Sequence, residues 1–351
     1  MPGAGCRVHA TLALQPRHLP VKNLLKRGAL VAAANWPVVV IQFVAQTTFQ
    51  VLLAVPIVGA AILVTVLLGT DLADILQGSL RDIFTAIAST LLSEPLALIA
   101  FVTAFAIVLL GGSVLMFVVK GGTLEVLLAA EAIAGPIEHE PITLERLKAA
   151  SRFSLSRFTD GCARLFRPFL SLGLMLMVVY AGSVGAYGAF LAYGYRVAEG
   201  RALIIGWTLI GALATVALIA WITIVNLIYL LMQIAIAAEG VGVAEAARDV
   251  WRFIRAEFRE LAAVFLVVVA LVVAATFASA LAWSGVGLIA FVPLVGLAVF
   301  PLQIVALLLR GIVFEYLGLT ALGAYLALYS RSGVADHVAQ HVRATVPVSH
   351  S

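Results

Sequence analysis

Long, unbroken runs of apolar residues alternate with short polar segments along this chain. A helix needs roughly 20 residues to cross the ~30 Å hydrocarbon core of a membrane, and these runs reach that length. Because apolar residues are continuous within each run and do not alternate with polar ones, the pattern favours helices over a membrane β-barrel. It predicts six spans, at about residues 36–68, 96–119, 168–193, 203–232, 261–283 and 286–309.

The segments before two of these runs carry the same charged and aromatic skeleton, 100 residues apart. The first copy consists of Glu145, Lys148, Arg152, Phe153 and Phe158, and the second of Glu245, Arg248, Arg252, Phe253 and Phe258. Such self-similarity predicts a repeated structural unit.

We therefore expect an all-α, polytopic membrane helix bundle: six transmembrane helices in three pseudo-repeated pairs, with interfacial amphipathic helices. A basic segment at 1–35 would precede a membrane domain at 36–331, and 332–351 would form a mobile tail. The repeated units would cover about 20–130, 142–240 and 241–331, the first being degenerate because its aromatic pair is missing.

On a 3.6-residue repeat, Val243, Val250 and Trp251 share one face of a helix, and arginines lie opposite. Such a helix lies in the membrane interface with its arginines toward lipid phosphate. It can serve as an anchoring collar, or as a specific site for anionic lipid or a partner protein. The candidate lipid contacts are Arg152, Arg248, Arg252 and Arg255. A further interfacial helix is expected at about 74–91, on the far side.

Composition agrees with a membrane protein, since 63% of residues are hydrophobic and 11% charged, against about 45–50% and 25% in soluble domains. All but three of the 22 Lys and Arg residues fall on one side of the predicted spans, which places both termini in the cytoplasm. The predominance of Arg over Lys and of Ala, Val and Leu suggests a bacterial source with a GC-rich genome. We therefore expect a protein of the bacterial inner membrane. Anionic lipids are the expected partners, and nothing indicates nucleic acid.

One face of the first span carries amides, at Asn35, Gln42, Gln46 and Gln50. Amides in hydrocarbon are unfavourable unless paired, so this face should turn inward. It can provide interhelical hydrogen bonds, worth ~0.6–2 kcal/mol each, or line a path for a head group or solute. Of the two, we expect the amides to lie on the flank of a neighbouring helix.

The sequence contains few groups of residues that could catalyse a reaction or bind a metal. The predicted spans contain no Asp, His or Lys to act as a general base. Arg310 and Glu315 stand at the predicted cytoplasmic border, where snorkelling and ion pairing account for them. His337 and His341 have metal-ligand spacing but lie in the expected tail without a third ligand. The sequence therefore predicts no enzyme, no cofactor and no metal site.

The segment Ala238–Ala247, followed by Trp251-Arg252-Phe253, resembles the "Glu-Gly-x-x-x-x-Glu-Ala … Trp-Arg-hydrophobic" junction of a group of six-helix bacterial inner-membrane proteins. The group includes the YciC-like proteins and the membrane domain of some glycerophosphodiester phosphodiesterases. The ending 324–331 is loosely similar to the group's "Leu-Tyr-x-x-Leu-Arg", with Ala327 and Ser330 departing from it. The resemblance implies a topology and no phosphodiesterase activity.

Two functions follow as expectations. The first is a non-catalytic inner-membrane protein that organises lipids or partner proteins in envelope maintenance. The alternative is a small-solute or lipid transporter whose polar path follows the first span.

Overall fold

In the computed structural model, residues 20–68, 93, 95–139, 141–198, 204–290 and 295–332 are described, and they form helices without strands. The helices in this part of the chain are α1 (Val21–Ala34), α2 (Trp36–Leu68), α5 (Pro95–Ile133), α6 (Leu144–Ala150), α7 (Leu155–Ala198), α8 (Ile204–Glu239), α9 (Val243–Ala256), α10 (Phe258–Ala290) and α11 (Val295–Arg331). Six of them, α2, α5, α7, α8, α10 and α11, are long and apolar enough to cross a membrane. The described part of the chain is thus all-helical, and its six long apolar helices are those of a multi-pass membrane protein.

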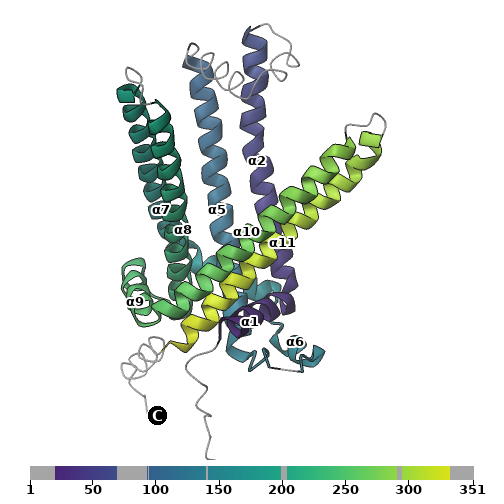
Figure 1. Ribbon diagram of the computed structural model, residues 1–351. Helices are drawn as coiled ribbons and strands as arrows, with labels where there is room; N and C mark the ends of the chain where they lie inside the picture. Colours follow the sequence, from purple (N-terminus) through teal and green to yellow (C-terminus); the bar gives the residue numbers. More distant parts are fainter. Residues whose placement is uncertain are drawn as a thin grey trace, which may run out of the picture.

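The long helices spread apart from a common base (Figure 1). Helix α7 lies beside α8 and α10 beside α11, whereas α2 and α5 stand apart toward the far end, and α10 with α11 inclines away from the other helices. The short helices α1, α6 and α9 lie at the base.

Most of the predicted spans are shorter than the helices they belong to. Only α2 has the predicted bounds, whereas α5 and α11 continue well past the charged residues expected to mark their ends. The start predicted at Pro168 was wrong, because α7 begins at Leu155 and includes that proline. A proline removes one backbone hydrogen bond without ending a membrane helix, since neighbouring groups satisfy the freed carbonyl. The border predicted between the last two spans was also displaced, since α10 runs on to Ala290.

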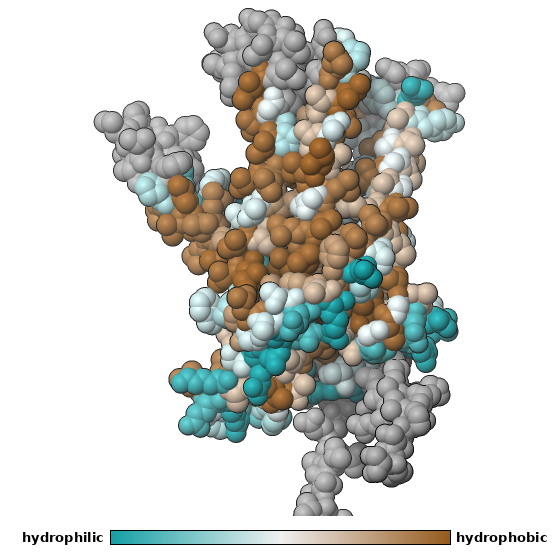
Figure 2. Space-filling model, turned by 180° about the vertical axis from the view of Figure 1, so that it is seen from behind, coloured by the Kyte–Doolittle hydropathy of each residue, from teal (hydrophilic) through white to brown (hydrophobic). Residues whose placement is uncertain are grey.

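Buried side chains concentrate at the base of the bundle. Leu124, Phe169, Ile234 and Leu326, each from a different long helix, are 0–1% exposed. Toward the other end the apolar side chains are open, as at Ile205, which is 87% exposed. Figure 2 shows the apolar residues as a broad belt above a hydrophilic band at the base. In a membrane this belt faces lipid.

Helices α1 and α11 cross at the base with their backbones in contact. A Cβ atom added to Gly28 would lie 2.2 Å from the Thr320 carbonyl oxygen, so only glycine fits there. Next to this crossing, the Tyr316 hydroxyl donates a hydrogen bond to the Ala29 carbonyl at 3.0 Å. The first and last helices of the described chain thus meet at one end of the bundle (Figure 1).

Three sequence-based predictions fall outside the described residues. These are the interfacial helix at about 74–91, the tail after residue 332 with His337 and His341, and the first 19 residues of the basic N-terminal segment.

Candidate functional site

A cavity of about 330 Å³ lies among α2, α5, α8 and α11. Its polar lining consists of Gln42, Gln46, Lys120, Thr123, Gln233 and Glu315, and its apolar lining is mainly leucine. An apolar pocket with a few convergent polar groups is the usual form of a ligand site in proteins.

Two opposite charges meet in this central cavity. Lys120 projects from α5 and Glu315 from α11, and the two attract each other across the space. The Lys120 ammonium also lies over the Tyr229 ring, 5.5 Å from its centroid. Charged residues that face the inside of a membrane bundle are rare, and they mark ligand or ion sites.

The amide of Gln233 has no hydrogen-bond acceptor in the described part of the chain. Gln233 is 1% exposed, and its Nε2 is buried and unpartnered although the side chain lines the central cavity. A buried donor without a partner costs about 1–3 kcal/mol. This donor is therefore suited to a polar ligand.

The predicted amide face of α2 divides between two roles. Gln42 is buried, and its Oε1 accepts a hydrogen bond from the Thr123 hydroxyl of α5 at 3.2 Å, as expected of interhelical pairing. Gln46 and Gln50 instead line a second cavity of about 700 Å³ between α2, α10 and α11. The two cavities share Gln46 and Glu315.

Asn35 does not belong to this face. It is fully buried at the junction of α1 and α2, where Nδ2 donates to the Ala150 carbonyl at 3.2 Å. Its Oδ1 accepts from the backbone N–H groups of Arg152 at 2.8 Å and Phe153 at 3.1 Å. All hydrogen-bonding atoms of this amide hold the linker after α6 to the base, which leaves none for a ligand.

The second cavity contains Arg310, whose guanidinium lies over the Phe314 ring, 5.7 Å from its centroid. Gly311 admits α2 closely here, because a Cβ at this position would lie 2.4 Å from the Phe43 ring. The rim of the cavity includes Ile304 and Leu307, which are 43% and 49% exposed. The cavity therefore opens onto the apolar surface, where the acyl chains of lipids lie.

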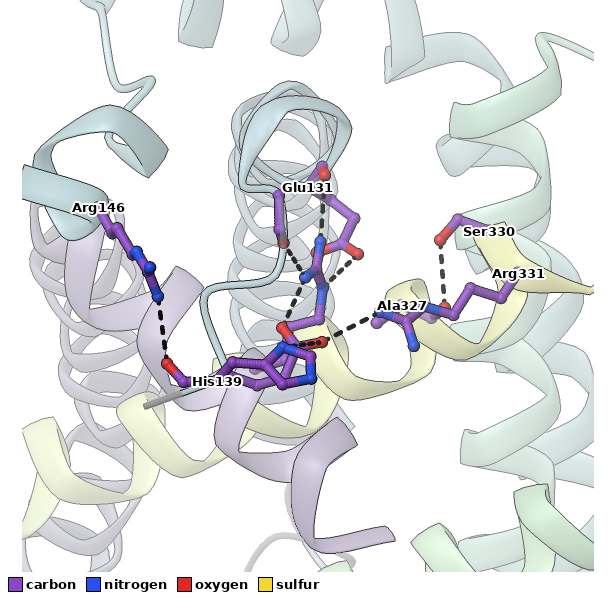
Figure 3. Close-up of polar contacts among 9 residues, drawn as sticks. Glu131, His139, Arg146, Ala327, Ser330 and Arg331 are labelled. Atoms are coloured by element: carbon purple, nitrogen blue, oxygen red, sulfur yellow. Dashed lines mark hydrogen bonds and ion pairs between the residues drawn. The ribbon is translucent and has the colours of Figure 1, made fainter. Parts of the chain in front are cut away.

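A separate ionic cluster joins four segments at the base. Arg27 of α1 donates to Glu131 at the end of α5 at 2.7 Å and to Glu138 of the following loop at 2.8 Å. Arg331, at the end of α11, lies 3.4 Å from Glu138. Figure 3 shows Glu131 and Arg331 approaching the cluster from different helices.

For Arg27 and Glu138, the opposite charges and hydrogen bonds in this cluster outweigh the penalty of burial. Burial disfavours the charged form of Arg27, but the carboxylates of Glu131 and Glu138 raise the pKa of Arg27 above its ordinary value. Burial also opposes ionisation of Glu138, yet hydrogen bonds from its own backbone and from Arg27, with the charge of Arg331, lower the pKa of Glu138. Because all these groups are paired, the cluster has a structural role.

Of the four arginines predicted to contact lipid, three lie on α9. Arg248 and Arg252 line an open hollow of about 660 Å³, and the Arg255 guanidinium stacks on Trp251, 4.8 Å from the ring centroid. Arg252 also forms an ion pair with the buried Asp249. Arg152 lies in the linker between α6 and α7, and α6 and α9 occupy opposite sides of the base (Figure 1).

The residues predicted to share the apolar face of α9 differ in burial. Val250 is buried against the base, whereas Trp251 is 55% exposed and remains open beside the arginines.

Sequence reasoning missed the role of Lys120, Gln233 and Glu315. The signal was available in the matched stretches Lys120-Gly-Gly-Thr-Leu-Glu125 and Arg310-Gly-Ile-Val-Phe-Glu315, each continued by apolar helix. A basic residue followed by glycine inside a longer apolar helix is a reason to expect an interior charge.

Among the described residues, no group of three His, Cys, Asp or Glu side chains could hold a metal ion. In comparisons with known proteins, no family model, no curated protein and no solved structure matches the chain. The function has to be inferred from the geometry of these cavities.

Proposed function

We propose that this chain is a non-catalytic, multi-pass membrane protein that binds the polar head group of a membrane lipid in the central cavity. The observation that carries the proposal is the Gln233 amide, buried without a partner in the described part of the chain, beside Lys120 and Glu315. These groups offer hydrogen-bond donors, a cation and an anion to one ligand.

A lipid suits the site better than a water-soluble solute. The central cavity shares Gln46 and Glu315 with the second cavity, whose rim is exposed and apolar. A ligand can thus enter sideways from the membrane, keeping its acyl chains outside and its head group inside.

The test compares the lipids that co-purify with the protein. Gln233→Leu and Lys120→Met should each lower the amount of tightly bound lipid several-fold, measured by mass spectrometry after detergent exchange. Gln303→Leu makes the same change on α11 and lines neither cavity, so it should behave as the unmodified protein does. Equal lipid content in all variants with unchanged melting temperature would reject the proposal.

Lipid translocation is a second candidate function. Gln42, Gln46 and Gln50 follow α2 from the central cavity into the second one, which provides successive polar positions along the helix. Transfer of a fluorescent lipid between leaflets of a reconstituted vesicle separates translocation from static binding.

We also propose the bacterial inner membrane as the location, with both termini in the cytoplasm, on the strength of the basic residues gathered at the base. An alkaline phosphatase fusion at Ser351 should then be inactive, and one near Glu199 active.

The three pseudo-repeated units and the interfacial position of α9 belong to the same proposal. They are supported by the repeated skeleton, since Phe158 and Phe258 stand in the first turn of α7 and of α10, respectively. Kinship with the YciC-like group rests on the quoted segments, among which Glu239 ends α8 and Gly240 begins the connection to α9. An organising role for partner proteins would use the exposed arginines of α9.

A further inference from the structure

Arg310 lies well inside the apolar span Pro301–Arg331, where an isolated cation is unfavourable. On insertion scales an arginine at the centre of a membrane helix costs about 2.5–3.5 kcal/mol. No carboxylate of the described residues forms an ion pair with Arg310, whose guanidinium lies over the Phe314 ring. The guanidinium therefore has the capacity to bind an anion.

The charged residues that line the two cavities have one net positive charge. Lys120 lines the central cavity and Glu315 lines both cavities, and their opposite charges cancel in the net charge of the lining. Arg310 of the second cavity is the charge left over, beside the uncharged polar groups of Thr47, Gln50 and Thr276. The site thus fits a ligand with one net negative charge.

The exposed apolar rim indicates that this anion belongs to a lipid. Ile304, Leu307 and Leu308 are 43–49% exposed at the mouth of the second cavity, next to the guanidinium. A phosphodiester at Arg310 would place the acyl chains at this rim and the head group toward Gln46 and the central cavity. Arginine is well matched to phosphate because its planar guanidinium donates two parallel hydrogen bonds.

We propose that Arg310 binds the phosphate of a phospholipid and makes the site selective for phosphate-bearing lipids. This rests on the proposed function, since it names the class of lipid that the two cavities hold.

The experiment titrates delipidated protein in detergent with a short-chain phosphatidylglycerol and with the diacylglycerol of the same chains. The unmodified protein should bind the phosphatidylglycerol at least about tenfold more tightly, as expected for charge-assisted hydrogen bonds. Arg310→Gln should remove this preference while keeping the diacylglycerol affinity, and Arg310→Lys should retain part of it. Arg157→Gln removes a half-buried arginine outside both cavities and should change neither affinity.

Equal affinity of the unmodified protein for the two lipids overturns the role of Arg310 and leaves the proposed function intact, whereas binding of neither lipid removes both proposals. The preference surviving in a folded Arg310→Gln variant also overturns the assignment. Inorganic phosphate is the third probe: if it competes at equal concentration, the site takes free phosphate and the lipid assignment falls. If the glutamine variant does not fold, Arg310→Lys still tests the assignment, because it should retain only part of the preference, and a full preference in that variant would overturn the role of the guanidinium.

Discussion

Arg27 and Glu138, separated by 111 residues of sequence, form a buried ion pair at 2.8 Å between Nη1 and Oε2. Their side chains are 6% and 1% exposed, so water does not replace either partner when the other is lost. The pair binds the first helix of the described chain to the loop after α5, and it thereby fixes the base on which the two cavities rest.

Arg27→Gln should lower the free energy of unfolding by about 3–5 kcal/mol, because it removes the ion-pair partner of the buried Glu131 and leaves the buried Glu138 with Arg331 alone. Lys22→Gln provides a matched control, since Lys22 is exposed on the same helix. The melting temperatures of both variants in detergent check this prediction. A loss equal to that of the control would show that the cluster contributes no stability.

Acid should weaken the same cluster. The folded state lowers the pKa of Glu138 below its ordinary value of 4.5, so the stability due to its charge is complete above that value. It is lost as the pH falls through the lowered pKa of the folded protein. The contribution of Glu138 to the melting temperature should thus be constant between pH 7 and pH 5 and should be lost below about pH 4. Glu138→Gln should abolish this part of the acid dependence, and an identical pH profile in that variant would contradict it.

Gly28→Ala should destabilise the protein by at least about 1–3 kcal/mol, the usual effect of overpacking. The added methyl group would meet the Thr320 carbonyl oxygen and the Ala324 backbone nitrogen, and neither can turn away as a side chain does. Gly182→Ala is the control, because no atom lies within 4 Å of a Cβ at that position. Alanine favours helix over glycine, so the control should be neutral or slightly stabilising.

The two roles of the α2 amides predict different responses. Thr123→Val removes the hydroxyl that donates to Gln42 and should cost about 0.5–1.5 kcal/mol of unfolding free energy. Gln46→Leu should change stability by less than ~0.5 kcal/mol, because Gln46 is half-buried and lines both cavities, but it should lower lipid binding. Chemical denaturation and lipid mass spectrometry on both variants test the pair. A Gln46→Leu variant that loses stability and retains lipid would make Gln46 an interhelical contact only.

The arginines of α9 should contribute to contact with anionic lipid, whereas Arg152 should not. Each arginine near an anionic surface is worth about 1 kcal/mol, so Arg248→Gln combined with Arg255→Gln should reduce retention of phosphatidylglycerol roughly tenfold or more. Native mass spectrometry of the protein released from mixed lipid nanodiscs measures this. Arg152→Gln is the matched control on another element, and an equal effect there would point to net charge instead of position.

The long helices could be predicted from the sequence because continuous apolar runs have few other stable forms in a membrane. Their ends could not be predicted as well. Pro168 was taken as a boundary although helices in membranes accommodate proline. The second span was predicted to end before Lys120, with apolar helix continuing to Ala130, and α5 runs on to Ile133. A charged residue marks the end of a membrane span only where its side chain faces water or lipid head groups. A charged side chain that faces an interior cavity can lie within the span.

The candidate site was predictable in part for a similar reason. Helical periodicity correctly placed Gln42, Gln46 and Gln50 on one face. It also included Asn35, which lies at the junction of two helices and whose side-chain oxygen accepts hydrogen bonds from the backbone of the linker at 151–154. The role of Gln233 could not be predicted from the sequence, because a single glutamine in an apolar run has no distinctive pattern. It stands out only in the structure, where its neighbours leave the amide without a hydrogen-bond partner.

The crossing of α1 and α11 has a consequence for biogenesis. Ala29 and Tyr316 are 287 residues apart, and a ribosome adding about 5–20 residues per second needs roughly 15–60 s to make the chain between them. Throughout that interval α1 has emerged while the groove that accepts Gly28 does not yet exist. The insertion machinery must shield the α1 face around Gly28 until the last helix arrives, whereas Arg27 can pair with Glu131 and Glu138 as soon as these have been made. A truncation before α11 would therefore leave a degradation signal at the start of the protein.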